Sequence, residues 1–222
     1  MSLLGIDDAG RGPLIGPMIL AGVLINKEQE KTFKKEQVTD SKLLFHEQRV
    51  RLAKTIKENS LSNKIIKVSA EEIDISLKSG TNLNKLEAKK SADIINYLNN
   101  TKKRIQVIID CPSVNTSAWK KTLLNFIKHP ANLTIKCEHK ADFNYAVVSA
   151  ASILAKVARE EEVAKIKKQF GNIGSGYPSD PTTKEFLKKH GKALEDSGIF
   201  RKTWATWKKA FPDKKQKKLS DF

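Results

Sequence analysis

Five short apolar segments, rich in β-branched residues, most constrain the fold of this 222-residue chain. Their lengths suit strands, and polar stretches separate them. They cover residues 3–6, 18–25, 64–68, 105–109 and 133–137. The first segments follow one another closely, whereas stretches with helical periodicity separate the later ones. This order predicts an α/β fold in which helices flank a five-stranded mixed sheet.

The helical patterns predict how the chain is divided. Helical patterns cover residues 45–57, with Phe45, Leu52, Ala53 and Ile56 on one face, and residues 83–98 and 116–127. A longer pattern at 145–170 begins with apolar or small residues on every side, so its first half should be buried. Turn formers at 171–181 end it, and short helices are expected at 182–190 and 204–210. We expect a main domain at 1–172, a C-terminal helical subdomain at 173–210 and a basic tail at 211–222.

The charge balance favours an anionic partner. The chain carries 41 basic and 25 acidic residues, for a net charge of +16, and nucleic acid is the first candidate. Two cysteines, Cys111 and Cys137, without a CxxC pair, predict neither a disulfide framework nor a zinc site. The longest apolar run, 18–25, is too short to span a membrane. We therefore expect a soluble cytoplasmic protein with no membrane partner.

The most informative motif lies at the end of the first predicted strand. It reads Gly-Ile-Asp-Asp-Ala-Gly-Arg-Gly-Pro at residues 5–13. Successive strand side chains point to opposite faces, so Asp7 and Asp8 serve one site only if the strand ends or bends there. Gly10 and Gly12 permit a bend and let backbone N–H groups approach an anion. A structural turn is the alternative interpretation.

Two further aspartates extend this acidic pattern. Asp110 ends a predicted strand, and Asp142 precedes the long buried helix, although each could instead cap a helix or turn. Together with Asp7 and Asp8 they form a carboxylate-only set, which favours Mg²⁺ or Mn²⁺ over zinc. Two such ions about 3.5–4 Å apart can promote phosphodiester hydrolysis.

Four segments in this order resemble ribonuclease HII, the type 2 ribonuclease H family, in its archaeal form. They are residues 5–13, Asp40-Ser41-Lys42, the pair 139–142 and 147–156, and Gly-Ser-Gly-Tyr-Pro-Ser-Asp-Pro at 174–181. The resemblance implies a ribonuclease H-like fold. It also implies endonucleolytic cleavage of the RNA strand in RNA/DNA hybrids and incision 5′ of ribonucleotides embedded in duplex DNA, leaving 3′-hydroxyl and 5′-phosphate ends.

The resemblance also implies roles for individual residues. The metal ligands and catalytic carboxylates would be Asp7, Asp8, Asp110 and Asp142, holding two Mg²⁺ or Mn²⁺ ions. The backbone of the GRG loop (Gly10, Arg11 and Gly12) would meet the 2′-hydroxyl of the ribonucleotide, and Tyr177 would contact the same sugar. Ser41 and Lys42 would hold a backbone phosphate. The resemblance further implies a monomer whose C-terminal subdomain binds substrate.

Asp8 departs from the family, whose second acidic position is normally glutamate. The charge is kept but the side chain is one methylene shorter, so we expect metal binding with altered geometry.

The tail resembles the Q-x-x-L-x-x-F motif by which replication proteins dock on a sliding clamp. Its three anchor residues would be Gln216, Leu219 and Phe222. The usual second aromatic residue is missing because the sequence ends at Phe222, so we expect a weakened affinity. A basic, disordered tail is the alternative.

Two other functions fit parts of the sequence. A DNA-processing nuclease of the same fold superfamily would use a similar carboxylate cluster, but Tyr177 and the GRG loop argue against it. A non-catalytic nucleic-acid-binding protein would explain the positive charge but not four carboxylates at element ends. His139, Lys156 and Arg159 receive no role, and Trp204 is expected to pack in the core.

Overall fold

The computed structural model of the chain describes residues 1–36, 38, 45–100 and 103–212. A five-stranded sheet has the order β3-β2-β1-β4-β5. Its strands are β1 (Ser2–Ala9), β2 (Met18–Ile25), β3 (Ser62–Val68), β4 (Ile105–Asp110) and β5 (Leu133–Glu138). Strands β1, β2 and β3 pair antiparallel, and β4 pairs parallel with both β1 and β5. The predicted five-stranded mixed sheet is confirmed.

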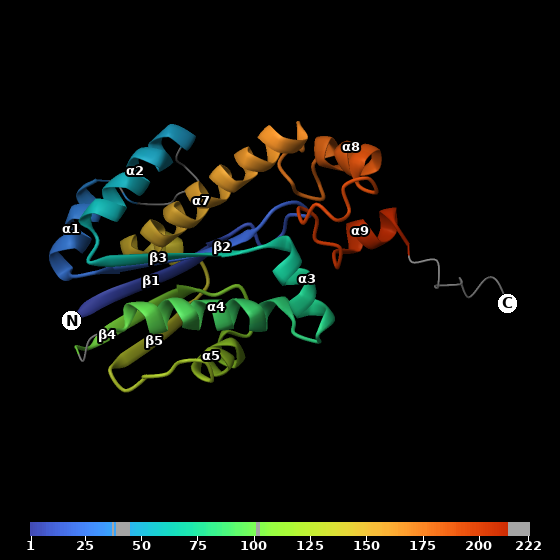
Figure 1. Cartoon of the computed structure of the whole chain (residues 1–222). Helices are drawn as coiled ribbons and strands as arrows, with labels where there is room; N and C mark the ends of the chain where they lie inside the picture. The colour runs from blue at the N-terminus through green and yellow to red at the C-terminus, as the bar shows by residue number, and fades with distance from the viewer. Residues whose placement is uncertain (37, 39–44, 101–102, 213–222) are drawn as a thin grey trace.

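Helices cover both faces of the sheet (Figure 1). On one face α7 (Ala146–Phe170) lies with α1 (Lys27–Lys35) and α2 (His46–Asn59). On the other face α4 (Leu83–Leu98) lies with α5 (Thr116–Leu124). The described residues also form α3 (Ala70–Lys78), α6 (Ala141–Asn144), α8 (Pro181–His190) and α9 (Ala205–Ala210). No helix in the described part of the chain is both long and apolar enough to cross a membrane.

Side chains of β1 alternate between two apolar cores. Leu4 and Ile6 pack in the core beneath α4. Gly5 points the other way, toward α7, where an added Cβ would lie 2.3 Å from the carbonyl oxygen of Val147. Only glycine permits this close approach of helix to strand. The first half of α7 is buried, as its composition predicted.

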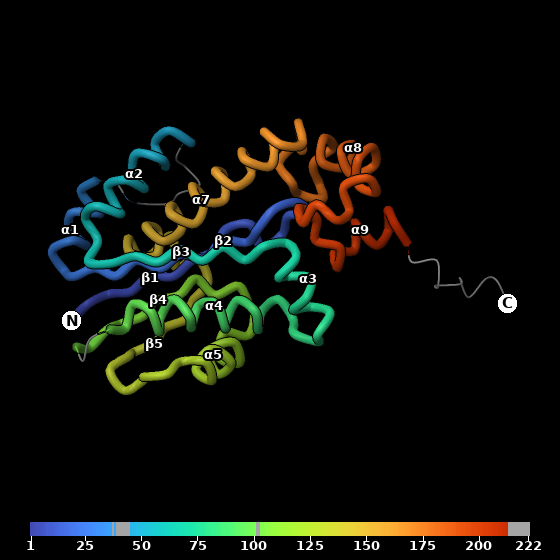
Figure 2. Tube along the Cα trace, in the orientation of Figure 1, coloured from blue at the N-terminus to red at the C-terminus, as the bar shows by residue number. Residues whose placement is uncertain are grey.

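The C-terminal helices pack around a third apolar cluster, at one end of the sheet. It includes Ile173, Phe186, Phe200 and Trp207, together with Leu14 and Ile15 from the β1–β2 connection. A backbone bridge joins Ile15 to Phe200. Figure 2 shows the blue β1–β2 connection reaching the red C-terminal segment. Trp204 packs against the apolar clusters, as expected.

Some local predictions were wrong. Helices α1 and α3 were not predicted, although the side chains of Asn26 and Ser69 cap their N-termini. Phe45 was placed on an apolar helix face, but it is the N-cap of α2 and is 79% exposed. The helix predicted at 116–127 ends at Leu124. Strand β1 continues through Asp7 and Asp8 to Ala9, so the chain does not bend at the aspartate pair.

Candidate active site

Three carboxylates from distant parts of the chain meet at one end of the sheet. Asp7 lies in β1, Asp110 ends β4 and Asp142 lies in α6. One carboxylate oxygen of each lies within 4.8 Å of the other two. The parallel pairing of β1 with β4 brings Asp7 and Asp110 together, because these strands run toward the same edge. The structure thus places three of the four predicted carboxylates within reach of one cation.

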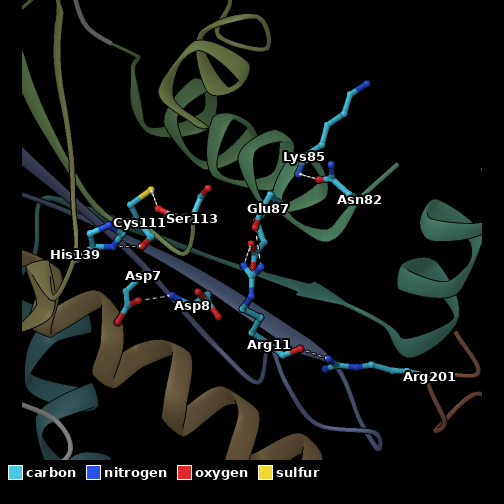
Figure 3. Close-up of polar contacts among 11 residues, drawn as sticks. Asp7, Asp8, Arg11, Asn82, Lys85, Glu87, Cys111, Ser113, His139 and Arg201 are labelled. Atoms are coloured by element: carbon cyan, nitrogen blue, oxygen red, sulfur yellow. Dashed lines mark hydrogen bonds and ion pairs between the residues drawn. The ribbon is translucent and has the colours of Figure 1, made fainter. Parts of the chain in front are cut away.

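The segment after β5 folds back over the end of β4 and positions Asp142. The backbone N–H of Cys111 donates to the carbonyl of Glu138 at 2.8 Å, and His139 Nδ1 lies 3.1 Å from the carbonyl of Cys111 (Figure 3). Lys140 adopts a left-handed conformation with φ 57°. The next N–H, of Ala141, donates to Asp110 Oδ1 at 3.1 Å. His139 therefore lies beside the carboxylates, where it supports the loop that follows Asp110.

Asp8 lies on the opposite face of β1 from Asp7. The Asp7 carboxylate faces α7, where the Ser152 side chain hydrogen-bonds to it, and it also accepts from the N–H of Asp8 at 2.7 Å. Asp8 faces the α4 side, where Glu87 and Arg11 lie near it. Figure 3 shows the two side chains leaving the strand in different directions. Asp8 is not among the three residues whose oxygen atoms cluster.

Glu87 of α4 adds a buried acid that sequence reasoning missed. It is 1% exposed and pairs with Arg11 (Figure 3). Arg11 Nη2 also donates to Asn84 Oδ1 at 2.7 Å. Burial, together with the charge of Glu87, raises the pKa of Asp8 to about 7, against the lowering effect of Arg11. Burial also raises the pKa of Glu87 to about 7. Its position on the buried face of a helix with Leu86 and Ser91 was the available signal.

The carboxylate cluster has the chemistry of a site for a hard divalent cation. Burial raises the pKa of Asp7 well above its ordinary value, and the negative charges of Asp8 and Asp110 add to this effect. Gathering ionised carboxylates at this spacing is unfavourable unless a positive charge lies between them. Oxygen-only donors suit Mg²⁺ or Mn²⁺. The residues present therefore fit a divalent metal.

Asp8 and the GRG loop line a cleft of about 500 Å³. Gly10, with φ +79°, ends the strand, and an added Cβ would lie 2.6 Å from the Arg159 side chain. Tyr177 lies across from Gly12, at 3.5 Å from the position that a Cβ would take. The cleft is lined by Asp8, Ala9, Gly10, Arg11, Gly12, Arg49, Lys156, Arg159, Glu160 and Tyr177. The structure thus brings the GRG loop and Tyr177 to one cleft.

Basic side chains line the far wall of this cleft. Arg159 stacks over the Tyr177 ring at 5.1 Å from its centroid and donates to the carbonyl of Ser175 at 3.1 Å. Arg49 donates to Glu160 at 2.5 Å, which joins α2 to α7. Arg49, Lys156 and Arg159 give the wall a positive charge beside the acidic cluster. Such a wall suits an anionic polymer.

Five predicted site residues lie outside the described residues. They are Ser41, Lys42, Gln216, Leu219 and Phe222. Arg201, in contrast, received no role from the sequence, yet it is fully buried beside the GRG loop and donates to the carbonyl of Gly10. A long-range contact of this kind leaves no local signal in the sequence.

Comparisons with known proteins agree with this geometry. The family model described as Ribonuclease HII matches residues 4–207. Ribonuclease HII of Methanocaldococcus jannaschii is 43% identical and is matched over 99% of both chains. The crystal structure of ribonuclease H2 from Pyrococcus horikoshii superposes with a TM-score of 0.84 at 36% identity, over 95% of this chain and 97% of that one. The enzyme in the PCNA:RNase HII complex of Archaeoglobus fulgidus superposes with a TM-score of 0.81 at 34% identity, over 100% of each chain.

Proposed function

The chain belongs to the ribonuclease HII family, and we propose that it is an endoribonuclease that cuts the RNA strand of RNA/DNA hybrids and incises 5′ of ribonucleotides embedded in duplex DNA. Cleavage would leave 3′-hydroxyl and 5′-phosphate ends. The observation that carries this proposal is the cluster of Asp7, Asp110 and Asp142 beside the GRG loop and Tyr177. Roles in ribonucleotide excision repair and in replication would follow from this specificity, and we propose the cytoplasm as the location.

Two Mg²⁺ or Mn²⁺ ions are the proposed cofactors. Asp7, Asp110 and Asp142 would hold them, and Asp8 would contribute from the other face of β1. When bound, such ions supply an activated water and stabilise the leaving oxygen. The hydrogen bonds from Ser152 to Asp7 and from the Ala141 N–H to Asp110 keep the carboxylates oriented.

The other residues of the cleft would select and hold the substrate. The N–H groups of the GRG loop and the Tyr177 side chain would contact the sugar of a nucleotide bound in the cleft. Contact with its 2′-hydroxyl would distinguish RNA from DNA. Arg49, Lys156 and Arg159 would contact phosphates along the wall. Ser41 and Lys42 would hold a further phosphate. We propose that residues 173–210, which include Tyr177, form a substrate-binding subdomain of a monomeric enzyme.

Three duplexes test the proposal: DNA with one ribonucleotide, all-DNA, and an RNA/DNA hybrid, each with Mg²⁺ or Mn²⁺. We expect cleavage of the first and third only. Asp110→Asn should lower kcat by about 10²-fold or more, because one carboxylate charge is lost where charge stabilisation dominates. Asp93→Asn, at an exposed position of α4, is the matched control and should leave kcat unchanged. Equal cutting of the all-DNA duplex would contradict the assignment.

A sliding clamp is the second proposed partner, through Gln216, Leu219 and Phe222. Support comes from the motif and from the related Archaeoglobus enzyme, whose solved structure is a complex with PCNA. The 222-residue protein should bind a cognate clamp, and Leu219→Ala and Phe222→Ala should weaken that binding. The same affinity for all three proteins would remove the clamp from the proposal.

A further inference from the structure

The main-chain carbonyls of the GRG loop are held from behind by two residues of the C-terminal segment. Arg201 is fully buried, and its guanidinium donates to the carbonyls of Gly10 at 2.6 Å and Arg11 at 2.7 Å. Its Nε donates to the carbonyl of Gly16 at 3.1 Å. The indole N–H of Trp204 donates to the carbonyl of Gly12 at 3.1 Å. Every carbonyl of the loop thus has a donor from residues 201–204.

The guanidinium group is suited to this task in a way that an ammonium is not. It presents several N–H donors in a rigid planar fork, so one side chain can bond to several carbonyls at once. The Trp204 ring stacks on it at 4.9 Å, which fixes the plane of the fork. A lysine would keep the positive charge but would lose most of these directed hydrogen bonds.

The segment that carries Arg201 is itself anchored. Asp74 of α3 is buried and accepts from the N–H of Lys202 at 2.6 Å, and from the N–H and hydroxyl of Thr203 at 2.9 and 2.5 Å. The N–H of Arg201 donates to the carbonyl of Leu14 at 2.9 Å. Arg201 therefore acts from a rigid base, not from a loose loop.

This arrangement determines where the N–H groups of the GRG loop point. A trans peptide unit holds its C=O and N–H in opposite directions. Because the carbonyls of Gly10 and Arg11 point toward Arg201, the N–H groups of Arg11 and Gly12 point away from it. Gly10, Arg11 and Gly12 line the cleft, whereas Arg201 lies buried behind them.

The side chain of Arg11 is also committed elsewhere. It bonds to Glu87 and Asn84 of α4, so it is held against the protein instead of reaching across the cleft. The recognition groups that the loop offers to a sugar are consequently its main-chain N–H donors. Their direction depends on the contacts behind the loop.

We propose that Arg201, supported by Trp204, is a positioning residue that aims the N–H groups of the GRG loop into the cleft and thereby sets the preference for ribonucleotides. This inference rests on the proposed function. It assigns the origin of specificity to a buried side chain that does not touch the substrate.

The test compares Arg201→Lys, Arg201→Ala and Trp204→Phe with wild type on the single-ribonucleotide duplex. Arg201→Lys should lower kcat by about 10²-fold, which is the usual effect of losing preorganised donors. It should lower the preference for binding the single-ribonucleotide duplex over the all-DNA duplex by a similar factor. Affinity for Mn²⁺ and for the all-DNA duplex should stay within about twofold, because those sites are untouched. Millimolar guanidinium should partly restore Arg201→Ala. Arg104→Ala, exposed before β4 and away from Asp110, is the control for loss of one arginine.

The outcomes separate the alternatives. A folded Arg201→Lys protein that keeps wild-type discrimination overturns the inference, as does an equal loss of ribonucleotide and all-DNA binding. If both Arg201 variants unfold, Trp204→Phe decides, because it keeps an aromatic ring while removing the indole donor to Gly12 and part of the ring's apolar packing. We expect the variant to remain folded and to lose severalfold in discrimination, and no loss of discrimination refutes the inference. Failure of wild type to prefer the ribonucleotide duplex would instead refute the proposed function.

Discussion

Replacing Glu87 by glutamine should stabilise the metal-free protein at alkaline pH and leave its stability almost unchanged in acid. Glu87 is 1% exposed and lies near Asp8. Burial raises the pKa of Glu87 from 4.5 to about 7, although Arg11 opposes the shift. An acid whose pKa rises on folding binds its proton more tightly in the folded chain, so folding is favoured when that proton is present.

The magnitude follows from the shift itself. A change in pKa from 4.5 to about 7 corresponds to roughly 3 kcal/mol in the free energy of unfolding. This stability is fully present below about pH 4.5 and is lost as the pH rises through about 7. Glutamine resembles the protonated acid, so Glu87→Gln should avoid most of this loss. The ion pair with Arg11 needs no separate correction, because its effect is already part of the shifted pKa.

Urea denaturation with a chelator present, at about pH 5, 7 and 8.5, measures this effect. The variant should exceed wild type by about 2–3 kcal/mol at the highest pH and by less than about 1 kcal/mol at the lowest. Glu58→Gln, on the exposed side of α2, is the matched control and should change stability by less than about 0.5 kcal/mol throughout. Parallel pH profiles for wild type and Glu87→Gln would refute the reasoning.

Three further predictions concern the site. Asp8→Glu should extend the carboxylate by one methylene and raise the Mg²⁺-supported rate relative to the Mn²⁺-supported rate; identical kinetics in both metals would show that the shorter side chain is neutral. Gly10→Ala should lower the melting temperature more than Gly80→Ala, because both have positive φ but only Gly10 has atoms within 4 Å of an added Cβ, and equal losses would contradict this. Duplex affinity should fall by about 10²-fold or more between roughly 50 and 200 mM salt, as expected for phosphate contacts, and a flat titration would exclude the basic wall as the binding surface.

The strands could be predicted from the sequence because each is short, apolar and flanked by breakers. Their order could not, because nothing local indicates that β4 lies beside β1. That pairing sets Ile6 opposite Ile109 and so brings Asp7 toward Asp110. The positions of four aspartates at predicted strand and helix ends suggested one metal site, and the family resemblance implied that they are its ligands. The structure brings three of them together, and the parallel pairing is the physical cause for Asp7 and Asp110. Likewise, Arg201 is separated from Gly10 by most of the chain, so no periodicity could reveal their hydrogen bond.

For the aspartate pair, the alternation of side chains along a strand predicted the directions of Asp7 and Asp8 better than their adjacency in the motif did. Alternation along a strand required a bend if Asp7 and Asp8 were to face one way. Strand β1 instead stays regular to Ala9, and the bend comes at Gly10. The two carboxylates therefore have different surroundings: Asp7 faces the apolar helix α7, whereas Asp8 faces Glu87 and Arg11.

This separation changes how the shorter side chain at position 8 should be understood. An aspartate there lies close to the strand and shares its charge environment with Glu87 and Arg11. The charge of Glu87 raises the pKa of Asp8 and that of Arg11 lowers it, and Arg11 is the central residue of the loop whose carbonyls bond to Arg201. The charge at Asp8 and the conformation of the GRG loop are thus linked through one arginine, so substitutions at Asp8 and Glu87 should be non-additive.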